Sequence, residues 1–64
     1  MKVTANDIYV DFCSSKESTV NFFTKWSKVS GKSPAKMFVE RYRRNYNCSE
    51  NTLLKAAKMI GLAS

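Results

Sequence analysis

The residues with the clearest chemical potential near the start of the chain are two carboxylates. Asp7 and Asp11 are four residues apart, so on a helix they would lie one turn apart on one side. Such a pair could act in general acid/base catalysis or hold a hard metal ion. The chain contains no histidine, and the pattern supplies no third ligand or base. We therefore expect Asp7 to stabilise a helix start through the helix dipole and both carboxylates to be solvated.

Two cysteines, Cys13 and Cys48, are the other candidate metal ligands. A zinc site needs a fuller set of cysteine or histidine ligands than this chain provides. We expect both residues to be reduced thiols that pack as small hydrophobic side chains. The alternative is a disulfide that joins the first helix to the turn before the last helix.

Two tyrosines, Tyr42 and Tyr46, lie among arginines and could act as nucleophiles in strand transfer. Both fall on the apolar side of a predicted helix, so we expect core side chains with hydroxyls at the rim. A glycine-rich phosphate loop is absent, because Gly31 and Gly61 are the only glycines. We therefore predict no catalytic residue, no metal site and no cofactor, and expect that the protein is not an enzyme.

The segment Ser33–Tyr46, SPAKMFVERYRRNY, is the part of the chain around which the predicted structure is organised. Ser33 is a good N-cap, and Pro34 suits the first helical position because its missing N–H has no partner there in any case. One face of this helix is apolar and consists of Ala35, Phe38, Val39, Tyr42 and Tyr46. The other side is strongly cationic, and Met37 is the apolar exception on it.

The predicted binding site combines this cationic face with bases before and after it. Its members are Lys32, Lys36, Met37, Arg41, Arg43, Arg44, Lys55 and Lys58. A helix, a turn containing Gly31 and a second, basic helix form the outline of a helix-turn-helix. The arginines would then contact phosphates or guanine edges. The fit is imperfect, because Lys32 stands where a buried apolar residue is expected after the turn glycine.

The remaining helices are placed by their caps and apolar spacing. We expect a first helix from a cap at Thr4 or Asn6 through about Ser14, and a second over about Glu17–Val29. Ser49 caps a last helix that Gly61 ends. The expected buried stripes are Ile8, Tyr9, Phe12 and Cys13 in the first helix and Leu53, Ala56, Ala57 and Ile60 in the last. The predicted fold is all-α: one small domain over residues 1–64, with about four short helices and a helix-turn-helix-like corner between the second and third.

The second helix carries the widest apolar arc, formed by Phe22, Phe23, Trp26 and Val29. Its aromatic rings could stack with bases, as in proteins that bind single-stranded nucleic acid. Aromatic residues at helical spacing in so small a domain are more often core residues. We therefore expect this arc to be buried against more than one neighbouring helix.

Charge and length limit the kind of function. The net charge of the 64 residues is +6, and residues 32–64 contribute +5 of it, which favours a polyanionic or acidic partner. So short a chain has little material from which to form a deep pocket. The first residues contain no apolar run of signal-peptide length, and the longest uncharged stretch, Ser18–Thr24, is far shorter than a membrane span. We expect a cytoplasmic protein that does not bind membranes.

Two functional hypotheses follow. The first is a small basic domain that binds nucleic acid, DNA more than RNA, through the cationic face of helix 33–46. The second is a protein-protein interaction module, either an adaptor or a small inhibitor of a larger protein, that binds an acidic surface through the same Arg/Met face. Homodimerisation is compatible with either hypothesis, because a small core gains stability when it buries a face against its copy.

Overall fold

The computed structural model describes residues 2–62, and this part of the chain is all-helical, without strands. Its elements in chain order are α1 (Ala5–Phe12), the 3-10 turn η1 (Cys13–Ser15), α2 (Lys16–Ser30), α3 (Pro34–Tyr42) and α4 (Glu50–Ile60). The all-α prediction is therefore confirmed for the described residues. Within residues 2–62, no helix is both long enough and apolar enough to cross a membrane.

Side chains in the sequence determine where three of the helices begin. The Thr4 hydroxyl accepts a hydrogen bond from the Asp7 N–H, and the Asp7 carboxylate accepts one from the Thr4 N–H, which completes a capping box at α1. Ser33 and Ser49 each accept a hydrogen bond from the backbone N–H three residues further on. Pro34 occupies the first turn of α3. The expected caps Ser33 and Ser49 are thus confirmed, and of the two candidates for the first helix, Thr4 and Asn6, the cap is Thr4.

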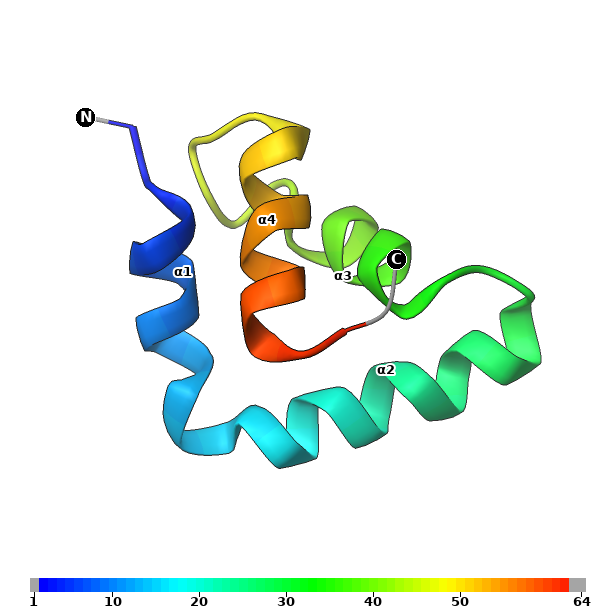
Figure 1. Cartoon of the computed structure of the whole chain (residues 1–64). Coiled ribbons are helices and arrows are strands. Elements are labelled where there is room, and N and C mark those ends of the chain that lie inside the picture. The colour runs from blue at the N-terminus through cyan, green and yellow to red at the C-terminus, as the bar shows by residue number, and fades with distance from the viewer. Residues whose placement is uncertain (1, 63–64) are drawn as a thin grey trace.

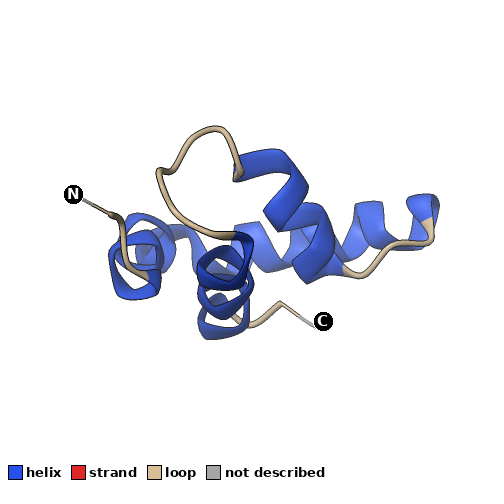
Figure 2. Ribbon diagram, turned by 90° about the horizontal axis from the view of Figure 1, so that it is seen from above, coloured by secondary structure: helices blue, strands red, loops and turns tan. Residues whose placement is uncertain are grey.

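The pair of helices α1 and α4 is crossed by α2 (Figure 1). The axes of α1 and α4 lie side by side, and both helices run from the top of the view to the bottom, while α2 crosses below them. The helix α3 packs against both α4 and α2. Seen from above, the last turns of α2 extend beyond α1 and α4 (Figure 2). The molecule is therefore elongated, with extents of 35 × 22 × 16 Å.

The core is one cluster where the inner faces of the helices meet. Its largest fully buried side chains are Phe38, Ile8, Leu53 and Ile60. The Phe38 ring lies 5.3 Å from that of Phe12, 5.6 Å from that of Phe23 and 4.9 Å from that of Tyr42, measured between centroids. These edge and tilted contacts join α1, α2 and α3. The buried stripe expected for the last helix, Leu53, Ala56, Ala57 and Ile60, is fully confirmed.

The third helix is shorter than the sequence predicts. It ends at Tyr42, and Arg43, Arg44 and Asn45 form a turn in which the Asn45 N–H donates to the Tyr42 carbonyl at 3.0 Å. The chain has to leave the helix there, because the next segment returns to α1. In that segment, the Tyr46 hydroxyl donates to Asp11 at 3.0 Å. The helix 33–46 is thus wrong over its last turn.

The prediction for the second helix is right in extent and wrong in burial. Phe23 is buried, whereas Phe22, Trp26 and Val29 are exposed. The reason is that α2 packs mainly against α3, while the end of α4 comes close to its early turns, where a Cβ added to Gly61 would lie 3.5 Å from the Val20 side chain. The side of α2 that carries Phe22, Trp26 and Val29 stays largely uncovered, and the Arg41 guanidinium of α3 lies 5.8 Å from the centroid of the Phe22 ring.

Candidate functional site

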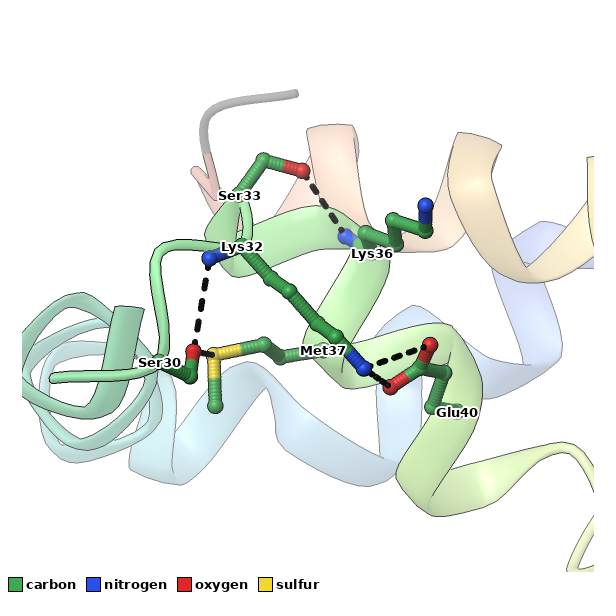
Figure 3. A network of polar contacts seen from close by, with 6 residues as sticks. All are labelled: Ser30, Lys32, Ser33, Lys36, Met37 and Glu40. Atoms are coloured by element: carbon green, nitrogen blue, oxygen red, sulfur yellow. Dashed lines mark hydrogen bonds and ion pairs between the residues drawn. The ribbon is translucent and has the colours of Figure 1, made fainter. Parts of the chain in front are cut away.

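The predicted basic residues around the α2–α3 corner are partly neutralised. Gly31 ends α2 with a φ of 76°, and its N–H donates to the Ser27 carbonyl at 2.9 Å. Lys32 follows, and its Nζ lies 3.0 and 3.2 Å from the two carboxylate oxygens of Glu40 (Figure 3). Lys32 therefore folds back onto α3.

Met37 is not the exposed apolar residue that the sequence predicts. Its side chain is half-buried and packs against the edge of the core, and its sulfur accepts a hydrogen bond from the Ser30 hydroxyl at 3.3 Å (Figure 3). Met37 thus closes the corner between α2 and α3. Part of its surface lines a shallow groove together with Ser30, Lys32, Glu40 and Arg41.

The exposed side of α3 has mixed chemistry. Ala35, Phe38 and Val39 are buried, and the residues on the other side of the helix are Lys36, Met37, Glu40 and Arg41. Two of these are basic, one is acidic, and Met37 is half-buried. The cationic face predicted for this helix therefore contains a carboxylate and a thioether.

Arg43 and Arg44 lie in the turn that follows α3. Arg43 forms an ion pair with Glu50 at 3.5 Å, which connects this turn to the start of α4. Both side chains are more than half exposed, so the pair adds little stability, but it lowers the local positive charge. Arg44 is exposed in the same turn.

Lys55 and Lys58 are exposed on α4, as the sequence predicts. Lys55 lines a groove between α4 and the start of α1, together with Lys2 and Met59. Arg41 lines different grooves, which lie between α2 and α3. The structure therefore does not gather the predicted site residues in one groove: Lys32, Met37 and Arg41 line the groove at the α2–α3 corner, and Lys55 lines the groove beside α1.

Arg41 is the predicted site residue with the most distinctive surroundings. Its guanidinium lies 5.8 Å from the centroid of the Phe22 ring and 5.8 Å from that of Tyr42. Cation–π contacts at this distance hold the side chain across the boundary between α3 and α2. Arg41 therefore presents its charge beside the exposed apolar side of α2.

That apolar side contains the residues that sequence reasoning assigned to the core. Phe22, Trp26 and Val29 follow one another at i, i+4 and i+7, so they form a row along α2. The Phe22 ring lies 6.3 Å from the Trp26 ring. We call Phe22, Trp26, Val29, Met37 and Arg41 together the α2–α3 face. The signal in the sequence was the width of the apolar arc on α2, which is greater than one packing neighbour can cover.

The groups that could have carried catalysis have structural roles. Hydrogen bonds from Thr4, chiefly from its backbone N–H, hold the pKa of Asp7 below its usual value. Asp11 accepts the Tyr46 hydroxyl bond, and burial, with a further contribution from Asp11, raises the pKa of Tyr46 to about 12. A tyrosine with so high a pKa is a poor nucleophile at neutral pH.

The two cysteines are free. Cys48 is half-buried and packs against the core, as expected. Cys13 is exposed, contrary to the prediction that it is buried, and its thiol lies 3.2 Å from the Val10 carbonyl. The 3-10 turn that starts at Cys13 redirects the chain from α1 into α2, which takes this residue off the buried stripe of α1.

No protein-family model matches this chain, and the comparisons with curated proteins and with solved structures also found no match.

Proposed function

We propose that this protein is a protein-protein interaction module that binds its partner through the α2–α3 face. The observation that carries the proposal is the row of Phe22, Trp26 and Val29, which are 46%, 45% and 73% exposed. Exposed apolar residues scattered singly are ordinary, whereas three large ones in a row are typical of an interaction surface. Covering them would contribute about 25 cal/mol for each Å² of apolar surface removed from water.

The composition of the face supports the same conclusion. Trp, Phe, Met and Arg are enriched at the centres of protein interfaces, and Trp and Arg are frequent hot spots. Here Trp26 and Phe22 supply the rings, and Arg41 supplies a charge held in place by its contact with Phe22. A side chain that is already held in one orientation loses less entropy on binding.

The test compares two exposed apolar residues on different helices. Trp26→Ala removes the centre of the row, and Val10→Ala is its control, because Val10 is exposed on α1. A protein that is captured by the wild type and by Val10→Ala, but not by Trp26→Ala, would be identified, purified and measured again in isolation. We expect Trp26→Ala to weaken that binary complex by about tenfold or more, and Val10→Ala to leave it unchanged.

Equal binding of the purified partner by the wild type and Trp26→Ala would contradict the proposal. Circular dichroism of both variants would show that each is folded, so that a loss of binding reports on the surface and not on unfolding.

Nucleic-acid binding is the second candidate, favoured by one specific observation. Glu40 and Glu50 each pair with one base, whereas Lys36, Arg44, Lys55 and Lys58 have no carboxylate within 4.0 Å among the described residues. With a net charge of +6, such bases support electrostatic contact with phosphates. The helix-turn-helix character of the α2–α3 corner stays a prediction.

A salt titration with random duplex DNA, followed by fluorescence anisotropy, tests this candidate. Binding through basic side chains should weaken as the salt concentration rises. The slope of log K against log salt concentration should be near −0.9 for each phosphate neutralised. Arg44→Ala should flatten the slope, whereas Trp26→Ala should leave it unchanged, because an indole carries no charge. Absence of binding even at low salt would exclude the duplex as a partner.

A further inference from the structure

The apolar row of Phe22, Trp26 and Val29 has basic residues on both of its long sides. Lys25 is three residues after Phe22 and four before Val29, so it lies next to the row on the side away from α3. Arg41 borders the row on the α3 side, over the Phe22 ring. Both bases are exposed, and neither forms an ion pair among the described residues. A partner that covers the apolar row must therefore come close to two cations.

We propose that the α2–α3 face docks an acidic amphipathic helix of a partner protein, with its apolar side on Phe22, Trp26 and Val29 and its carboxylates beside Lys25 and Arg41. This inference rests on the proposed function and names the chemistry of the partner. The row extends over eight residues of α2, and the seven steps between Phe22 and Val29 amount to about 10 Å at 1.5 Å per residue. Two turns of a partner helix with apolar residues at i, i+3 or i+4, and i+7 match that length.

A second copy of this chain fits the face less well, for a reason of charge. Each copy carries a net charge of +6. In a twofold interface the same patch appears on both sides, so the patch that contains Lys25 and Arg41 would meet a patch with the same two bases. Acidic residues on a different protein remove that repulsion and replace it with attraction, which also speeds association.

The area of the row gives a second reason. Side chains of this size have a surface on the order of 150–250 Å², so the exposed parts of the three residues amount to roughly 300 Å². A stable dimer interface of standard size buries about 800 Å² on each partner. A single docked helix can cover a narrow row of this area and reach the flanking bases.

Two synthetic peptides of about 16 residues test the charge requirement. Both carry leucines at i, i+4, i+7 and i+11, and the positions that flank the leucines are Glu in one peptide and Gln in the other. Trp26 is the only tryptophan of the chain, so its fluorescence reports directly on whether the row is covered. We expect a saturable blue shift with the Glu peptide, and binding of the Gln peptide that is at least about fivefold weaker at low salt.

Four variants, one of them a control, locate the effect. Arg41→Gln and Lys25→Gln should each reduce the preference for Glu over Gln peptide, because each removes one cation at the row. Lys16→Gln is the matched control, since Lys16 is an exposed base at the start of α2 that lies beside Gly61 and outside the face, and the preference should stay unchanged. Val29→Ser should weaken both peptides by a similar factor, because it removes apolar contact and no charge.

The inference is overturned if the Gln peptide binds as tightly as the Glu peptide, or if neither peptide shifts the Trp26 emission. It is also overturned if sedimentation shows self-association that Val29→Ser abolishes, or if duplex DNA shifts the emission more strongly than the Glu peptide does. If the peptides fail while the purified partner still depends on Trp26, only the chemistry named here is wrong. If that partner binds Trp26→Ala normally, the proposed function itself is wrong.

Discussion

At the scale of single residues, the side chains with acid/base chemistry stabilise the fold. Asp7 completes the capping box of α1 with Thr4, and Asp11 accepts a hydrogen bond from Tyr46, which is 35 positions away in the sequence. The Asp7 carboxylate thus holds the start of α1, and the Asp11 carboxylate holds the segment that contains Tyr46 against α1. Their removal should therefore change stability and leave the α2–α3 face intact.

The capping box gives a prediction about acid stability. Thr4→Ala should lower the free energy of unfolding by about 1 kcal/mol, because an N-cap hydroxyl is lost. Asp7 has a lowered pKa in the folded state, so its contribution is complete above its unfolded pKa and is lost as the pH falls through the folded value. The stability difference between the wild type and Asp7→Asn should accordingly disappear in acid. Urea unfolding at a series of pH values measures both effects.

Thr24→Ala is the control for Thr4→Ala, because Thr24 is exposed in the middle of α2. Its stability should stay within about 0.5 kcal/mol of the wild type. An equal loss in the two variants would contradict a capping role for Thr4.

Tyr46 gives a prediction about the stability of the protein at alkaline pH. Its pKa is raised from 10.0 to about 12 in the folded protein, so the folded state retains the phenolic proton longer than the unfolded state. The stability from this group is complete below pH 10 and is lost as the pH rises from about 10 to about 12. We expect Tyr46→Phe to lose less stability than the wild type over that range.

An ultraviolet titration of the wild type and Tyr46→Phe provides the direct measurement, because the difference between the two curves is the titration of Tyr46 alone. Asp11→Asn should move that titration to lower pH, since it removes the neighbouring carboxylate. A Tyr46 titration centred near pH 10 would show that the tyrosine is not held by this contact.

At the scale of helices, the corner after α2 decides how the α2–α3 face is assembled. Gly31 is in the left-handed conformation, and the next helix begins at Pro34 after only two intervening residues. This tight connection brings Arg41 of α3 over Phe22 of α2. The position of the basic Arg41 relative to the apolar residues of α2 therefore depends on the turn at Gly31.

Gly31→Ala should destabilise the protein by about 1–2 kcal/mol. A methyl group at this position would meet no atom within 4 Å, so the whole cost comes from the positive φ of 76°. Gly31→Asn should cost less, because asparagine tolerates this conformation better. Asn21→Ala, exposed in α2, serves as the control in thermal unfolding. Equal stability of wild type and Gly31→Ala would show that the turn is not held in this conformation.

At the scale of the whole molecule, one small core joins all the helices. Phe38 lies in its middle and contacts rings from α1 and α2 as well as from its own helix. A domain of this size is marginally stable, so the loss of one central side chain is a large fraction of its stability. The exposed row on α2 contributes little to this core.

Phe38→Ala and Trp26→Ala should consequently have opposite outcomes, although both remove an aromatic ring. Phe38→Ala should cost about 3–5 kcal/mol and leave the chain largely unfolded, whereas Trp26→Ala should cost about 1 kcal/mol or less. Far-ultraviolet circular dichroism during thermal unfolding distinguishes them. A large loss of stability in Trp26→Ala would place its ring in the core and contradict the α2–α3 face.

The sequence by itself determined the local structure of this protein. Helix ends are set by local signals: the hydroxyl caps are Thr4, Ser33 and Ser49, and Gly31 ends α2. Each acts on backbone groups within a few residues. The buried stripe of the last helix was equally predictable, since its apolar residues share one narrow face. The proposed site was predicted only in part: Met37 and Arg41 were included, whereas Phe22, Trp26 and Val29 were assigned to the core.

Only the tertiary structure decided which faces are covered. A helical pattern shows that Phe22, Trp26 and Val29 lie on one side of α2, but not whether another helix packs there. Likewise, the end of α3 at Tyr42 depends on the return of the chain to Asp11, and the neutralisation of Lys32 depends on Glu40, which is eight residues further along in α3. These outcomes come from contacts between segments distant in the chain, which local propensity and periodicity do not contain.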